Sequence, residues 1–284
     1  MDEVGLGKRL QKARQAAGMT QQELCHKASL SYSTLAKIER GAIKSPSIFT
    51  IQHIAAALQT SLSELMGEAP PITAKRYRSK TGIEFIYFDI NGCLVRFFQR
   101  AFAELSKDTG VGSDVIEAAF WHYNDRVCRG EMSMPEFNAV LGKRLGVERL
   151  DWLEYYMSAI SRIDEMSEVV LWAAQHYRVG LLSNIMPGYI DTMLQRGLLP
   201  SAAYDQIIDS SQVGAIKPES EIYAIAQKRA ALAPEKILLI DDSRANVMAA
   251  EHAGWKVLWF DAYRPEESSR RVRELLEPAE EVNG

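Results

Sequence analysis

The chain of 284 residues is poor in cysteine and contains no long apolar run. Its three cysteines, Cys25, Cys93 and Cys128, are few and scattered, which argues against a disulfide framework or a cysteine-rich metal site. No uninterrupted apolar stretch approaches the roughly 20 residues that a membrane-spanning helix needs. The opening MDEVGLGKRL also lacks the apolar core of a secretory signal. These absences predict reduced thiols, a cytoplasmic location and no membrane partner.

Charge is distributed unevenly along the chain. Residues 1–82 carry 12 Lys and Arg against 6 Asp and Glu, whereas residues 83–284 carry 21 against 31. The net charge of −4 therefore combines a basic first part with an acidic remainder. A basic segment favours contact with a polyanion, so we expect a nucleic-acid partner for the first part only.

The basic part has the pattern of a small helical domain. Apolar residues recur at helical spacing in five short segments between residues 6 and 66, and glycines follow two of them. Thr20 and Glu23 form a capping-box pattern at the start of the second segment. The third segment, SYSTLAKIERG, opens with small polar residues after a short turn. Two helices joined in this way predict a helix-turn-helix.

The run from GMTQQEL to IQHIAAAL resembles the Cro/repressor-type helix-turn-helix family over nearly the whole of residues 1–66. The resemblance implies a helix that enters the major groove of double-stranded DNA, with the preceding helix on the backbone. Because one such domain makes a small footprint, we expect a homodimer on a palindromic operator. The DNA-binding residues that the resemblance implies are Gln21, Ser31, Tyr32, Ser33, Thr34, Lys37, Arg40 and Lys44.

A segment without periodicity, residues 67–82, follows and is expected to be a linker. Beyond it, apolar runs alternate with helical segments, which predicts a buried parallel sheet. The first three runs end in Asp89, in Ser183-Asn184 and in Asp241-Asp242. Because ligands bind at the carboxyl ends of parallel strands, these polar ends are expected to converge on one site.

These segments, together with VGAIKPESEIYAIAQ around Lys217, resemble the haloacid dehalogenase-like (HAD) hydrolases, closest to the branch of sugar-phosphate phosphatases and epoxide-hydrolase N-terminal domains. The resemblance implies a Rossmann-like domain over 83–284, with a core of residues 83–96 and 179–284. The interval of about 97–178 is expected to be an inserted α-helical cap that closes over the site.

The resemblance also implies an aspartyl-phosphate chemistry that needs Mg²⁺. Asp89 matches the nucleophile, and Lys217 matches the cation that steadies the phosphoryl group. Ser183 and Asn184 match the segment that binds that group. The implied metal ligands are Asp89, the backbone carbonyl of Asn91, and Asp242, with Asp241 nearby and acting through water.

Asn91 departs from the pattern of many HAD phosphatases, which place an acid at this position. Asn cannot transfer a proton, and loss of a general acid or base typically costs ~10²–10⁴-fold in rate. The chain is therefore expected to bind Mg²⁺ and a phosphorylated small molecule, whereas turnover stays open.

Three interpretations follow. The first is a DNA-binding regulator whose HAD-like domain is a sensor. The second is an active Mg²⁺-dependent phosphatase, and the third is a HAD-like domain that only supports dimerisation. A metal-free dehalogenase is disfavoured, because the paired carboxylates of Asp241 and Asp242 beside Asp89 would then lack a neutralising charge.

Overall fold

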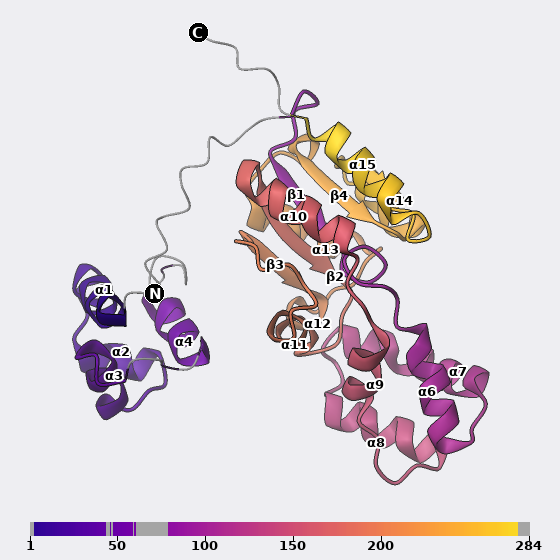
Figure 1. The fold of residues 1–284 in the computed structure, drawn as a ribbon, viewed down its shortest axis with the longest axis horizontal. Coiled ribbons are helices and arrows are strands. Elements are labelled where there is room, and N and C mark those ends of the chain that lie inside the picture. Colours follow the sequence, from indigo (N-terminus) through magenta and orange to yellow (C-terminus); the bar gives the residue numbers. More distant parts are fainter. Residues whose placement is uncertain (1–2, 44–45, 47, 59, 61–78, 278–284) are drawn as a thin grey trace. The chain divides into compact units, whose positions relative to one another are not determined.

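The structure is a computed structural model, and it describes residues 3–43, 46, 48–58, 60 and 79–277. The chain divides into two compact units, Met1–Ala74 and Lys75–Gly284 (Figure 1). Each unit has its own buried core, so the two are described separately.

The first unit is all-helical in its described part. Ser31 and Thr20 cap two of its helices, and the Thr20 side chain and Glu23 form both hydrogen bonds of the expected capping box. The fifth helix expected over residues 61–66 lies outside the described residues. The helices are α1 (Glu3–Ala16), α2 (Gln21–Lys27), α3 (Tyr32–Glu39) and α4 (Ile48–Leu58).

A small apolar core and one buried ion pair hold this unit together. Leu10, Leu24 and Leu35 are fully buried and join α1, α2 and α3. Arg14 Nε lies 2.7 Å from Glu39 Oε1, and both side chains are almost completely buried. Arg14 also donates to the carbonyl oxygen of Met19 at 2.8 Å, which ties the end of α1 to the turn before α2. The two charges are therefore satisfied within the unit, as buried charges must be.

The second unit is built on a five-stranded parallel sheet of order β3-β2-β1-β4-β5. The edge strand β3 was not expected from the sequence, since it is short and partly exposed. The strands are β1 (Phe85–Phe88), β2 (Arg178–Ser183), β3 (Gln206–Asp209), β4 (Ile237–Asp241) and β5 (Lys256–Trp259).

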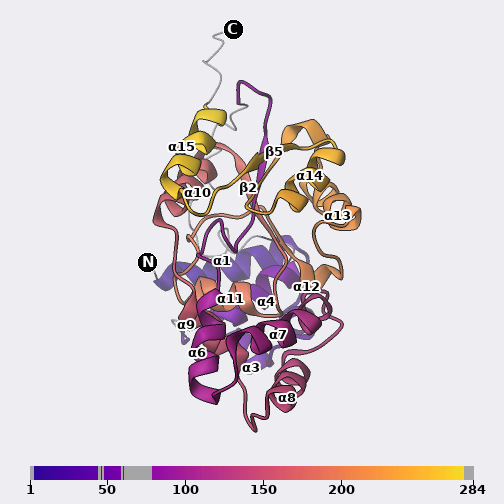
Figure 2. The same cartoon turned by 90° about the vertical axis from the view of Figure 1, so that its right-hand side faces the viewer.

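Helices cover both faces of the sheet, so β1 is buried on both sides. Phe85 and Tyr87 belong to one core cluster, whereas Ile86 and Phe88 belong to the other, as the two-residue period of a strand requires. Figure 2 shows α10 and α15 on one side and α13 and α14 on the other. The bounds are α10 (Asp164–His176), α13 (Ser220–Ala230), α14 (Arg244–His252) and α15 (Pro265–Leu275). Two short helices, α11 (Tyr189–Gln195) and α12 (Ser210–Val213), and the 3-10 turn η1 (Pro234–Lys236) complete the sheet layer.

Four further helices form an insertion between β1 and α10. They lie together beyond one end of the sheet (Figures 1 and 2). The insertion ends earlier than the expected boundary near 178, because α10 packs against α15 and β2 and so belongs to the sheet layer. The helices are α6 (Gln99–Thr109), α7 (Ser113–Cys128), α8 (Met134–Leu145) and α9 (Trp152–Ala159).

Two extended segments connect the insertion to the core. Val95 pairs with Arg162 in an antiparallel bridge, and Arg96 N donates to the carbonyl oxygen of Ser161 at 2.8 Å. The insertion therefore leaves and re-enters the core at adjacent points.

The end of the expected linker belongs to the described structure. Residues 79–82 form a turn in which Ser79 is buried and its hydroxyl accepts from Ile83 N at 2.9 Å; residues 67–78 lie outside the described part.

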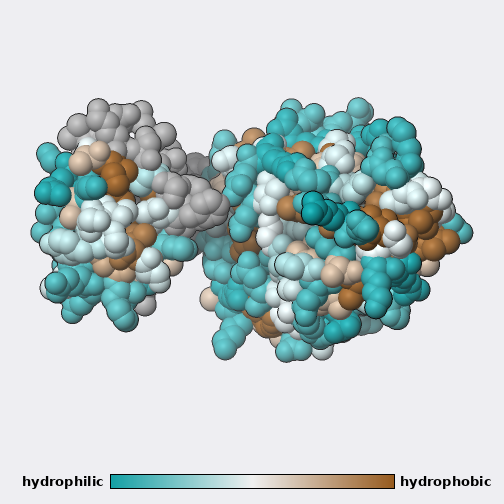
Figure 3. Space-filling view, turned by 90° about the horizontal axis from the view of Figure 1, so that it is seen from below, coloured by the Kyte–Doolittle hydropathy of each residue, from teal (hydrophilic) through white to brown (hydrophobic). Residues whose placement is uncertain are grey.

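Among the described helices, none combines the length and the apolarity that crossing a membrane requires. The face in Figure 3 is mainly hydrophilic, with hydrophobic patches between the polar side chains.

The buried ion pair of the first unit predicts a local loss of stability. Glu39→Ala leaves Arg14 buried without its partner and should lower the free energy of unfolding of this unit by roughly 3 kcal/mol. All five tryptophans lie beyond residue 83, so tryptophan fluorescence reports only on the second unit. Thermal unfolding of the full chain should show an earlier helical transition by circular dichroism and an unchanged fluorescence transition. Lys37→Ala, at an exposed position of the same helix, is the control and should leave both unchanged.

Candidate active site

Polar residues from three adjacent strands meet at one edge of the sheet. Asp89 follows β1, Ser183 ends β2 and Asp241 ends β4, and all three strands run in the same direction. The backbone of Asp89 is held by a hydrogen bond from its N–H to the carbonyl oxygen of Ile240 at 2.9 Å. The sheet register therefore brings together side chains that are more than 150 residues apart.

A buried lysine lies at the centre of this edge. Lys217 is 2% exposed, and its Nζ lies 2.9 Å from Asp89 Oδ1 and 2.5 Å from Asp241 Oδ2. It also donates to the carbonyl oxygen of Leu182 at 2.9 Å. Burial works to lower the pKa of Lys217, but the charges of Asp241 and Asp89 raise that pKa above its ordinary value. The ammonium group is therefore charged and fully engaged.

Asn184 and Asp241 hold Lys217 in place. The Asn184 side chain donates to the Lys217 carbonyl oxygen and accepts from the Lys217 N–H, both at 2.7 Å. Asp241 accepts from Lys217, from Ser243 N at 2.9 Å and from the Asn246 amide at 3.0 Å. Both side chains are thus engaged within the protein framework. The ligand contact of Asn184 and the water-mediated role of Asp241 near the metal stay predictions.

Asp242 approaches the loop after β1 very closely. A Cβ atom on Gly92 would lie 2.0 Å from Asp242 Oδ2, and Gly92 adopts a φ of +84°. Both the backbone conformation and the lack of space require glycine here. The absence of a side chain at Gly92 therefore leaves room for the Asp242 carboxylate beside Asp89.

The two facing carboxyl groups are both perturbed. Burial, with a contribution from the Asp241 charge, raises the pKa of Asp89 to about 6 against the opposing effect of Lys217. Burial and the charges of Asp89 and Asp241 raise the pKa of Asp242 to about 7. Two carboxylates pair with the Lys217 ammonium group and Asp242 lies close to Asp89, so three carboxylates and one ammonium leave two formal negative charges within this cluster. A divalent cation would neutralise that excess.

The available atoms fit a metal ion in part. An oxygen of Asp89, an oxygen of Asp242 and the Sγ of Cys93 lie within 4.8 Å of one another. Mg²⁺ prefers oxygen ligands, so Asp89 and Asp242 suit it. Cys93 was not among the predicted ligands; its thiol is fully buried, and burial raises its pKa well above the ordinary value. The thiol is therefore protonated at neutral pH and is a weak ligand for a hard cation.

Ser183 offers a hydroxyl group to this site. Its side chain is 1% exposed, and its Oγ makes no hydrogen bond of good geometry within the described residues, although the hydroxyl lies close enough to Asp89 to lower the pKa of that carboxyl group. Buried hydroxyl groups are normally paired, so an unpaired one at the end of β2 suits a bound oxyanion.

The insertion contacts this edge at two points. Tyr156 of α9 is buried, and its hydroxyl donates to Asn91 Oδ1 at 2.5 Å. Arg129, at the end of α7, forms a two-pronged ion pair with Glu219, two residues after Lys217. A Cβ atom on the adjacent Gly130 would lie 2.2 Å from the Ser211 carbonyl oxygen. The insertion is therefore docked on the core in this structure.

Sequence reasoning missed Tyr156, which lies in no motif, and Asn246, which lies four residues after Asp242 and whose bond to Asp241 only the structure shows. Among the charged residues of the insertion, Arg129 contacts the core through Glu219. Gly92 lies in the same short stretch as Asp89 and Asn91, but its close approach to Asp242 depends on the tertiary structure.

The predicted DNA-binding residues lie mostly on the exposed side of α3. Ser31 is its N-cap, and the Ser31 hydroxyl interacts with the hydroxyls of Ser33 and Thr34 at 3.1 and 2.8 Å. Tyr32 is 55% exposed. The exposed members are Ser31, Tyr32, Ser33, Lys37 and Arg40.

Two other members of the set need separate comment. The side-chain amide of Gln21 donates to Glu39 Oε2 at 2.7 Å, so this nitrogen is engaged by the buried ion pair before any DNA arrives. Lys44 lies outside the described residues.

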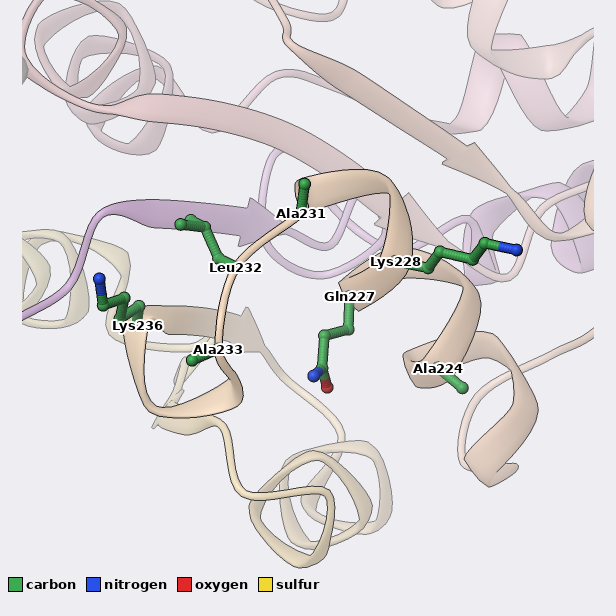
Figure 4. A pocket seen from close by; sticks show the side chains of 7 residues that line it. All are labelled: Ala224, Gln227, Lys228, Ala231, Leu232, Ala233 and Lys236. Atoms are coloured by element: carbon green, nitrogen blue, oxygen red, sulfur yellow. The ribbon is translucent and has the colours of Figure 1, made fainter.

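A surface groove at the other end of the sheet is a separate feature (Figure 4). It lies between the end of α13 and η1, and Gln227, Lys228 and Lys236 are among its lining residues. Lys236 precedes β4 and pairs with Glu84, which precedes β1. The groove is thus at the amino ends of the strands, whereas Asp89 and Asp241 are at their carboxyl ends.

The fold and this edge define the class of protein. Residues 83–254 match the family model of the haloacid dehalogenase-like hydrolases, and the chain belongs to this family. Residues 10–65 match a helix-turn-helix family model, which confirms the predicted Cro/repressor-type domain.

Individual relatives agree with this assignment. The chain is 27% identical to a D-ribitol-5-phosphate phosphatase from Bacteroides thetaiotaomicron over 157 residues, which are 51% of this chain and 72% of that protein. It is 30% identical to an (S)-2-haloacid dehalogenase from Pseudomonas fluorescens over 83 residues, 29% of this chain and only 36% of the dehalogenase. The chain thus spans about a third of that relative's length.

Solved structures show the same fold. A predicted HAD-like hydrolase from Porphyromonas gingivalis superposes with a TM-score of 0.56 at 25% identity, over 67% of this chain and 98% of that one. A HAD-family enzyme from Bacteroides thetaiotaomicron, crystallised with magnesium, gives a TM-score of 0.57 at 22% identity, over 64% of this chain and 94% of its own.

The crowded carboxylates predict an unusual effect of Asp242→Asn. A carboxyl group whose pKa is raised in the folded state opposes folding once it ionises, so its penalty appears as the pH rises from about 4 to above 7. Without metal at pH 8, Asp242→Asn should therefore raise the free energy of unfolding by about 1–3 kcal/mol. The same variant should lose the stabilisation that millimolar Mg²⁺ gives the unaltered protein.

Denaturant unfolding with EDTA and with Mg²⁺ measures both effects. Asp164→Asn, at an exposed carboxylate of α10, is the control and should retain the Mg²⁺ response. A metal-free Asp242→Asn protein that is less stable than the parent, or an intact Mg²⁺ response in it, contradicts the assignment.

Proposed function

We propose that the chain is a DNA-binding transcriptional regulator whose HAD-like domain binds Mg²⁺ and a phosphorylated small molecule as a sensor. One observation carries the proposal. Lys217 and Ser183, whose ammonium and hydroxyl groups suit a phosphoryl ligand, lie around Asp89, whereas the position two residues later holds Asn91, which cannot transfer a proton. The helix-turn-helix domain in the same chain supplies an output for ligand binding.

The residues of the site have distinct proposed roles. Lys217 holds Asp89 and places a positive charge beside the position of a phosphoryl group. The unpaired Ser183 hydroxyl donates to a phosphoryl oxygen. Asp89 is the group that would attack phosphorus, and its pKa of about 6 keeps it mostly ionised at neutral pH. Asp242 completes the metal site with Asp89.

Mg²⁺, when bound, would offset the repulsion between these carboxylates and the anionic ligand. The magnesium in a structural neighbour, and the excess of negative charge in the cluster, support this cofactor. The same excess disfavours a metal-free dehalogenase, even though short segments of curated dehalogenases match this chain.

The second candidate is an active Mg²⁺-dependent phosphatase that carries a DNA-binding domain. The similarity to a curated sugar-alcohol phosphate phosphatase favours it. In this case the proton for the leaving oxygen would come from the substrate, the solvent or the insertion. The domain organisation in both cases is 1–66 for DNA, 67–82 as the linker and 83–284 for the ligand, in a cytoplasmic homodimer on a palindromic operator.

The DNA-binding role predicts that residues at the two ends of α3 contact different parts of the DNA. Arg40→Ala should weaken binding to all duplexes and reduce the dependence on salt by about one phosphate contact. Ser33→Ala should instead change the sequence preference, because side chains at the start of α3 are placed to reach base edges. Selection from a random duplex pool, followed by anisotropy titrations at several salt concentrations, measures both.

Lys12→Ala, at an exposed position of α1, serves as the control for loss of a positive charge. Unchanged operator binding by a chain that lacks residues 1–66 would refute the assignment.

Asn91→Asp decides between the two candidates. If the chain is a sensor, the variant regains a proton-transfer group two residues from Asp89, and phosphate release should rise by ~10²-fold or more. If it is a phosphatase, the parent already turns over and the variant changes little. The measurement is phosphate release from sugar phosphates and an aryl phosphate at saturating Mg²⁺, with Asp89→Asn as the inactive control. Brisk turnover by the parent with no gain in the variant rejects the sensor.

A further inference from the structure

The contact between Tyr156 and Asn91 joins the insertion to the loop that carries Asp89. The Tyr156 hydroxyl lies 2.5 Å from Asn91 Oδ1, and the two residues are 65 positions apart in sequence. Tyr156 belongs to α9, whereas Asn91 follows β1. The hydrogen bond therefore exists only while the insertion is docked on the core.

The surroundings of Tyr156 hold its ring firmly. It is 3% exposed, and its ring centroid lies 4.8 Å from those of both Phe98 and Tyr189. Phe98 comes from the segment that enters the insertion, and Tyr189 comes from α11 of the core. Aromatic neighbours on two sides leave the hydroxyl little freedom to turn away from Asn91.

The hydroxyl acts as a hydrogen-bond donor. A phenol is protonated at neutral pH, and the bond joins its oxygen to the side-chain oxygen of Asn91, which has no proton to donate. Asn91 therefore receives the bond on its oxygen, and its amide nitrogen points away from Tyr156, since the two atoms lie on opposite branches of a planar group. The nitrogen has no hydrogen-bond partner among the described residues.

An orientation of this kind suits an anion. A carboxylate at position 91 would repel a phosphate dianion unless it were protonated, whereas an amide N–H attracts the dianion and keeps its own protons. Ser183 and Lys217 lie beside Asp89 and are further groups that can bind an anion.

We propose that Tyr156 is a positioning residue: its hydrogen bond to Asn91 presents the Asn91 amide nitrogen to the phosphorylated ligand and makes ligand affinity depend on the docked insertion. The inference rests on the proposed phosphoryl site and extends it. It names the residue through which ligand binding and the position of the insertion are coupled.

The second contact of the insertion supports this coupling. Arg129 pairs with Glu219, which lies in the segment that begins at Lys217, and Gly130 is pressed against the Ser211 carbonyl oxygen. The insertion thus touches the core near both sides of the ligand site. A ligand that binds the Asn91 amide would stabilise the docked insertion. By thermodynamic linkage, docking of the insertion would strengthen ligand binding by the same free energy.

Tyr156→Phe removes one oxygen atom and tests the proposal, because the ring packing is retained. The neighbouring Tyr155, on the same helix, donates its hydroxyl to the exposed Asp108 at 2.8 Å, and Tyr155→Phe is the matched control. The affinity of the full-length protein for inorganic phosphate is measured by calorimetry at saturating Mg²⁺. Loss of one positioning hydrogen bond should weaken binding roughly 3–10-fold in Tyr156→Phe and leave Tyr155→Phe unchanged.

A double-mutant cycle separates positioning from a general structural effect. Asn91→Ala should weaken phosphate binding, and adding Tyr156→Phe to it should cause no further loss, because Tyr156 acts through Asn91. The unfolding midpoint of each protein without ligand is recorded beside the affinity, so a loss of stability alone is visible as such.

Two results would overturn the inference: parental affinity in Tyr156→Phe, or the same fold-loss in the presence and absence of Asn91. A parent protein that binds no phosphate with Mg²⁺ contradicts the proposed function itself, and this outcome differs from one in which the parent binds and Tyr156→Phe binds equally well.

Discussion

The geometry of the site depends on one buried ammonium group. Lys217 lies between Asp89 and Asp241, and without it these carboxylates could not share the carboxyl edge of the sheet. The cost of burying a lysine is offset only when its donors are all used, and here a backbone carbonyl takes the remaining one. Asn184 holds the loop that carries Lys217, because its side chain bonds both the N–H and the carbonyl oxygen of Lys217. The positions of the sheet, of the loop that carries Lys217 and of the loop after β1 therefore depend on one another.

The remaining imbalance of charge supports the proposed cation and oxyanion ligands. Asp242 brings a further negative charge close to Asp89, and the raised pKa values of both groups show how unfavourable this is without a cation. Binding sites commonly store such unfavourable interactions, which a ligand then relieves. A cation followed by an oxyanion would satisfy Asp242, Asp89 and the unpaired Ser183 hydroxyl in turn.

Asn91 and the insertion distinguish this chain from a simple hydrolase site. An amide at this position can hold an anion but cannot move a proton, and Tyr156 gives that amide a defined orientation. Because Tyr156 belongs to the insertion, the same hydrogen bond would link a ligand at Asn91 to the position of the insertion. In the proposed regulator, the ligand would then act through the difference in its affinity for two arrangements of the insertion.

Much of the fold follows from local pattern. The capping box of α2, the termini of α1 and α3 at glycines, and four of the five strands were predicted, because caps and apolar periodicity act over a few residues. The rule that parallel strands present their carboxyl ends at one edge was sufficient to bring Asp89, Ser183 and Asp241 together. The edge strand β3 was missed, and α10 was assigned to the insertion, because helical periodicity does not tell which layer a helix packs against.

Other features are set by the tertiary structure. The engagement of Gln21 by Glu39, the use of Asn184 and Asp241 within the framework, and the approach of Tyr156 to Asn91 all join residues that are far apart in sequence. The sequence by itself determined which residue types reach the sheet edge, since strand direction and spacing decide that locally. Only the tertiary structure decided which of them remain available to a ligand, because hydrogen-bond partners from distant segments take up the others.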